Sequence, residues 1–90
     1  MLPGGDLVAK GLADLRSGSE SEESLLVAIG AHRLRASGLD VPASPAPWPP
    51  EHRLYEALAR VDADGAHGRY NALLRRLVSF ERALEDAQGG

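Results

Sequence analysis

A proline-rich segment near the middle of the chain limits its fold more than any other feature. Residues 40–50 read Asp-Val-Pro-Ala-Ser-Pro-Ala-Pro-Trp-Pro-Pro and hold five of the six prolines. Proline lacks a backbone N–H and fixes φ, so this segment suits neither a helix interior nor a central strand. We expect an extended connector of roughly 30 Å, at about 3.1 Å per residue, that carries the chain from one end of a helical domain to the other.

The segment before the connector begins with a short amphipathic pattern. Apolar side chains recur at helical spacing over about residues 7–16, which predicts one helix with a single apolar stripe. Asp6 is the candidate N-cap, and Gly18 is expected to end the helix. Gly11 lowers the helix propensity of this segment.

A second helix is predicted over about residues 20–36. Ser19 and Glu22 have the spacing of a capping box at its start. Apolar residues spread around most of its circumference, which indicates a central helix covered on several sides. Gly30 costs about 1 kcal/mol of helix propensity relative to alanine, so we expect another backbone to pass close to it.

Two more helices are predicted after the connector, over about residues 51–61 and 66–86. Pro49 and Pro50 are well placed at the opening of the first of them. The second carries the strongest periodic pattern in the chain, an apolar seam at a/d spacing formed by Tyr70, Leu73, Leu77, Phe80 and Leu84. Leu74 and Val78 lie to one side of this seam, and the wider apolar band predicts a second contact surface.

These patterns predict one all-α domain over residues 1–90, a four-helix bundle-like arrangement of two short and two longer helices. A chain of 90 residues buries only about 60 to 65% of its unfolded surface, so a partner subunit would add stability. Cysteine is absent, which excludes disulfides and zinc-thiolate sites.

Composition also limits the classes of function. The net charge is −3, with −2 over residues 1–50 and −1 over residues 51–90, a distribution that argues against binding to nucleic acid or to anionic membranes. No apolar run approaches the roughly 20 residues that span a bilayer, and no signal peptide is recognisable, so we expect a cytoplasmic protein. Nine of the ten basic residues are arginine, a bias expected of a GC-rich bacterial genome.

Three histidines are the main candidates for chemistry. His32 falls on an apolar face of the second predicted helix, where a hydrogen-bonded core or interface histidine is the plainer interpretation and a ligand or base the alternative. His52 and Glu56 are four residues apart and would face one metal ion, but no third ligand follows at a recognisable spacing. We therefore predict neither a metal site nor a cofactor.

Two further sites have alternative interpretations. His67 and Arg69 lie in a glycine-rich helix start, which is either an anion site built on free N–H groups or a flexible turn. Trp48 is either an anchor for another protein or a side chain that fixes its own connector against the helices.

The sequence contains no catalytic signature. The leading hypothesis is a non-enzymatic interaction module that forms a homodimer through the surplus apolar surface of the helices over 20–36 and 66–86, with Leu74 and Val78 near their symmetry mates. The alternatives are a small hydrolase or nuclease using histidine with arginine and glutamate, and an anion or ligand sensor at the start of the last helix.

Overall fold

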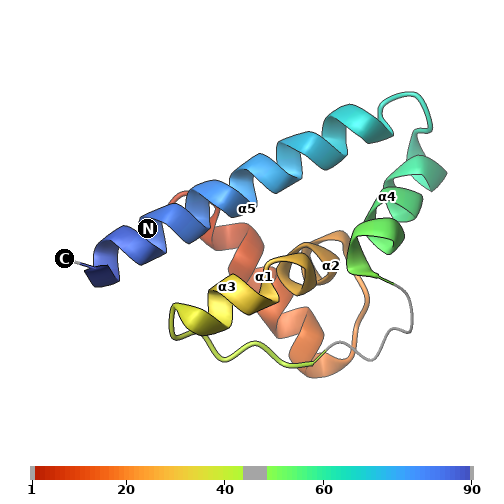
Figure 1. Ribbon diagram of the computed structural model, residues 1–90. Coiled ribbons are helices and arrows are strands. Elements are labelled where there is room, and N and C mark those ends of the chain that lie inside the picture. Colours follow the sequence, from red (N-terminus) through yellow and green to blue (C-terminus); the bar gives the residue numbers. More distant parts are fainter. Residues whose placement is uncertain (1, 44–48, 90) are drawn as a thin grey trace.

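The computed structural model describes residues 2–43 and 49–89, and this part of the chain forms five α-helices and no strand (Figure 1). The all-α prediction is therefore confirmed. Trp48 and its predicted role lie outside the described residues. The helices are α1 (Gly5–Ser17), α2 (Glu22–Ile29), α3 (Ala31–Ala36), α4 (Pro50–Val61) and α5 (Ala66–Gly89).

The short helix α2 is the centre of the fold, as the apolar pattern predicts. It contacts α1, α3, α4 and α5. Its residues Leu25, Leu26 and Val27 are at most 3% exposed, because neighbours cover the helix on several sides. Figure 1 shows α5 lying across the layer of α1 to α3, with α4 descending from the N-terminal end of α5.

The single helix predicted over residues 20–36 is wrong, because the chain bends at Gly30 and forms α2 and α3 instead. Gly30 has φ −89° and ψ 5°, outside the helical range of ψ. A Cβ atom at Gly30 would lie 2.8 Å from Glu81 Oε2 and 3.0 Å from Leu77 Cδ1, so side chains of α5 pack against the bare glycine. The close neighbour is thus a pair of side chains and not the backbone that the sequence predicts.

The close backbone approach occurs at Gly11, where α1 crosses α2. Gly11 is buried, and a Cβ atom there would overlap the carbonyl oxygen of Glu23 and a methyl group of Val27. Glycine therefore lets these two helices pack at short range. The effect of Gly11 on helix propensity, which is all that the sequence indicates, is the smaller part of its role.

The two N-caps predicted before the connector are also wrong. α1 begins at Gly5, and Gly4, with φ 75° and no side-chain cap, precedes it, so Asp6 lies inside the first turn. Gly4 sits against the carbonyl of Arg76, where a Cβ atom would come within 2.8 Å of the oxygen. This contact with α5, which no local pattern reveals, fixes where the helix begins.

The N-cap of α2 is Ser21, and its capping box pairs Ser21 with Ser24 instead of Ser19 with Glu22. Ser21 is favoured because its hydroxyl also reaches the carboxylate of Asp14 on α1. The predicted stop at Gly18 is confirmed, since Gly18 follows α1 with φ 77°. Gly38, with φ 97°, lies in the same left-handed region shortly after α3.

The C-terminal half follows its sequence pattern closely. Pro49 is the N-cap of α4 and Pro50 its first residue. α4 buries Leu54 and Leu58 completely. The predicted seam of α5 faces the core: Leu77 and Phe80 are buried, and Tyr70, Leu73 and Leu84 are partly buried against the same cluster.

Candidate functional site

The three histidines are exposed and stand on three different helices, α3, α4 and α5. The interpretation of His32 as a core residue is wrong, because the chain bends at Gly30 and His32 is exposed on α3; a role at an interface stays a prediction. His52 Nε2 lies 3.0 Å from Glu56 Oε1, and His67 Nε2 lies 3.1 Å from Asn71 Nδ2. Within residues 2–43 and 49–89, no group of three histidine or acidic residues could hold a metal ion.

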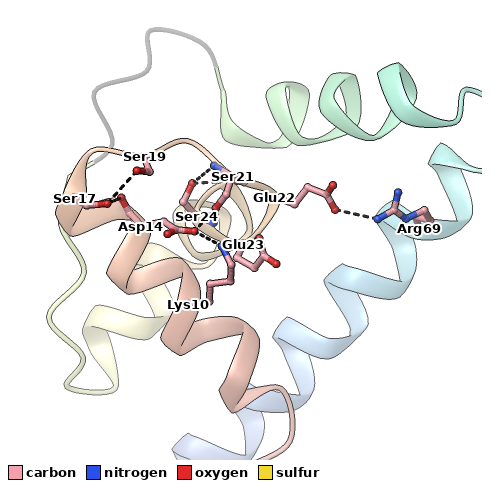
Figure 2. Close-up of polar contacts among 9 residues, drawn as sticks. All are labelled: Lys10, Asp14, Ser17, Ser19, Ser21, Glu22, Glu23, Ser24 and Arg69. Carbon is pink, nitrogen blue, oxygen red and sulfur yellow. Dashed lines mark hydrogen bonds and ion pairs between the residues drawn. The ribbon is translucent and has the colours of Figure 1, made fainter.

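A polar cluster links the end of α1 to the start of α2 (Figure 2). The Ser21 hydroxyl donates to Asp14 Oδ2 over 2.6 Å and accepts the Ser24 N–H over 3.0 Å. The Ser24 hydroxyl in turn accepts the Ser21 N–H. Lys10 Nζ lies 2.7 Å from the same Asp14 oxygen and 3.6 Å from Glu23 Oε1.

Serine, lysine and aspartate also occur together in catalytic sites that use an activated serine, but the arrangement here is different. Hydrogen bonds from Lys10 and Ser21 hold the pKa of Asp14 below its usual value, so Asp14 is a poor proton acceptor. Both serine hydroxyls are engaged in capping α2. The cluster therefore joins α1 to α2 and offers no activated nucleophile.

The arginine of the predicted anion site is engaged within the molecule. Arg69 Nη2 lies 3.1 Å from Glu22 Oε1 and connects the first turn of α5 to the first turn of α2 (Figure 2). The carboxylate of Asp62 lies against Gly65 at the start of α5, in the region that an anion would approach. These contacts do not favour the anion-sensor alternative.

Glu81 is a buried carboxylate on α5 that is not among the candidate residues predicted from the sequence. Its residue is 4% exposed, and its Oε1 lies 3.2 Å from Arg33 Nη1. Arg33 also binds Glu85, with 2.7 Å between Nη2 and Oε1. Burial raises the pKa of Glu81, the Arg33 charge opposes this rise and the Glu85 charge adds to it.

The position of Glu81 beside the seam is the only sequence signal for its burial. Its depth depends on α3, which turns at Gly30 and brings Arg33 over α5. Glu81 therefore orients α3 on α5, and we assign it a structural role.

One face of α5 is uncovered and forms a shallow, open depression, here called the outer α5 surface. All of its lining residues belong to α5: Asn71, Leu74, Arg75, Val78, Ser79 and Arg82. Leu74 and Val78 are half-buried, and Leu74 also packs against the core. The pair forms the apolar part of the surface, and its role in a contact stays a prediction.

The outer α5 surface carries two positive charges that no carboxylate of the described chain matches. Arg75 and Arg82 are exposed, and neither forms an ion pair in the part of the chain that the structure describes. Five other basic residues each bind a carboxylate: Lys10, Arg33, Arg53, Arg69 and Arg76. Arg75 and Arg82 are not among the candidate residues that the sequence predicts, because the absence of a partner for them is seen only in the folded chain.

Comparisons with known proteins add no family to this description. No protein-family model matches the chain, and no significant match was found among curated proteins or among solved structures. None of the described helices has the length and apolar character needed to cross a bilayer.

Proposed function

We propose that this chain is a non-enzymatic protein-interaction module that binds a helix of another chain along the outer α5 surface. The observation that carries the proposal is the half-buried pair Leu74 and Val78, one helical turn apart, in a depression lined by α5 alone. Helix-in-groove complexes use apolar residues at this spacing as anchors. The three histidines, exposed on separate helices, do not favour the hydrolase or nuclease alternative.

The size of the surface predicts a transient complex. Covering the apolar pair contributes about 25 cal/mol for each Å² of apolar surface removed from water. The face of one helix offers less area than the total of about 1,200 Å² that a standard stable interface buries. A homodimer, the partner predicted from the sequence, would use the same pair.

The test is a titration of the isotope-labelled chain with a synthetic amphipathic helix that carries a leucine stripe and uncharged glutamine flanks. We expect amide chemical shifts to change along residues 71–82 and Val78→Glu to weaken binding at least about tenfold, because it places a charge in the apolar contact. Val61→Glu is the matched control, since Val61 is 73% exposed at the end of α4 and lies outside the surface.

Two outcomes would contradict the proposal. One is a set of shift changes that avoids α5. The other is equal weakening by Val78→Glu and Val61→Glu, which would show that the added charge acts without regard to its position. Thermal unfolding of each variant checks that the fold is retained.

A further inference from the structure

We infer that the partner of the outer α5 surface is an acidic amphipathic helix, whose apolar stripe covers Leu74 and Val78 and whose carboxylates pair with Arg75 and Arg82. The inference rests on the proposed function and adds the chemistry of the partner. It follows from an apolar pair bordered on one side by two exposed, unmatched guanidinium groups.

The spacing of the two arginines suits binding to carboxylates on a second helix. They are seven residues apart on α5, which places them two turns and about 10 Å apart on the same side of the helix. A partner helix with carboxylates seven residues apart repeats this spacing. Arginine binds carboxylate through two parallel hydrogen bonds, which adds orientation as well as affinity.

The rest of the molecule shows that this charge is unusual for the chain. Five of its ten basic residues bind carboxylates of their own chain, and such contacts join α3 to α5 and α5 to α2. Arg35 forms no ion pair among the described residues, but it donates hydrogen bonds to the carbonyls of Val41 and Pro42. Arg16 and Arg60 are also without an ion pair among the described residues, but each lies in the last turn of its helix, where a positive charge interacts favourably with the helix dipole. Arg75 and Arg82 lie in the middle of α5, where that explanation fails.

The same charges disfavour a second copy on this surface. In a parallel two-fold pair each arginine would lie beside its own mate. In an antiparallel pair centred on Val78, Arg75 of one copy would lie near Arg82 of the other. Like charges this close are repulsive.

A shifted antiparallel register does not remove the repulsion. Placing Arg75 opposite the exposed Asp86 of a second copy centres the pair between Phe80 and Glu81. That register brings the two copies of Arg82 together and moves Leu74 towards the end of the contact. An acidic helix from another protein satisfies both the apolar pair and the arginines.

The experiment measures binding of three labelled synthetic helices by fluorescence anisotropy. They share one leucine stripe and differ only at two flanking positions seven residues apart, which hold glutamate, glutamine or lysine. We expect the wild-type chain to bind the glutamate helix at least about tenfold more tightly than the lysine helix, with a preference that weakens as salt is added. R75E/R82E should reverse this order.

The matched control is R16E/R60E, which changes the net charge equally with two exposed arginines away from the surface. It should keep the wild-type order of affinities. Reversal of the order in R16E/R60E as well would overturn the inference, because net charge alone would explain it.

Further outcomes separate this inference from the proposed function. Equal affinities for the three helices, each lost in Val78→Glu, would overturn the acidic partner and leave the interaction module. A concentration-dependent dimer in sedimentation velocity that Val78→Glu makes monomeric would identify a second copy as the occupant and also overturn it. A monomer that binds none of the three helices would overturn both.

Discussion

At the scale of single residues, Glu81 makes stability depend on pH. Burial raises its pKa in the folded chain above the ordinary value of 4.5, so the folded state holds this proton more tightly than the unfolded state does. The contribution of Glu81 to stability is therefore greatest below pH 4.5. It falls as the pH rises through the folded-state pKa.

Replacement of Glu81 by glutamine is expected to remove this dependence. Arg33 keeps its two hydrogen bonds to Glu85 in the variant, so α3 remains anchored. In urea unfolding between pH 4.5 and 8, the midpoint urea concentration of Glu81→Gln should increase relative to that of the wild type as the pH rises. Asp86→Asn, an exposed change on the same helix, is the control, and parallel pH profiles for Glu81→Gln and wild type would contradict the expectation.

At the scale of elements, the crossing of α1 and α2 depends on Gly11. Gly11→Ala is expected to destabilise the fold by roughly 1 to 3 kcal/mol, because the new methyl group meets the Glu23 carbonyl and Val27. Gly68→Ala is the control, since a Cβ atom at Gly68 in α5 meets nothing within 4 Å. Alanine there should stabilise the helix by up to about 1 kcal/mol. Similar unfolding free energies for the two variants would contradict the close packing of α1 against α2 at Gly11.

The start of α2 gives a second comparison at this scale. Ser21→Ala removes the N-cap and the hydrogen bond to Asp14, and should cost roughly 1 to 2 kcal/mol of unfolding free energy. Ser19→Ala changes an exposed residue whose hydroxyl bonds only that of Ser17 among the described contacts, and should cost a few tenths of that. Denaturant unfolding measures both free energies. A larger loss of unfolding free energy for Ser19→Ala than for Ser21→Ala would contradict Ser21 as the N-cap and favour Ser19, the position predicted from the sequence.

The elements that follow local rules are the ones that the sequence predicts well. The prolines before α4 and the seam of α5 place these two helices within a few residues of their observed bounds, because backbone restriction and burial act in the same direction there. Gly30 is different. Leu77 and Glu81 of a distant helix pack against it, and residues 31–36 form a separate helix instead of continuing α2.

At the scale of the whole molecule, one part of the outer α5 surface could be predicted from the sequence and another part could not. Periodicity alone identifies Leu74 and Val78, because their position beside the seam is a property of one helix. The unmatched charges of Arg75 and Arg82 become visible only when four other arginines are seen to reach carboxylates, up to 70 residues away in the case of Arg76 and Asp6. Ion pairs between distant elements follow from the fold and from no local pattern.

The central place of α2 also has a consequence for synthesis of the chain. Leu25, Leu26 and Val27 lie in the first third of the sequence, yet their cover includes α4 and α5 from the second half. While the ribosome is still adding those helices, this apolar segment has only α1 and α3 beside it. The nascent chain thus carries an aggregation-prone stretch until α4 and α5 have been synthesised, and the acidic residues at 20, 22 and 23 keep one end of that stretch hydrated.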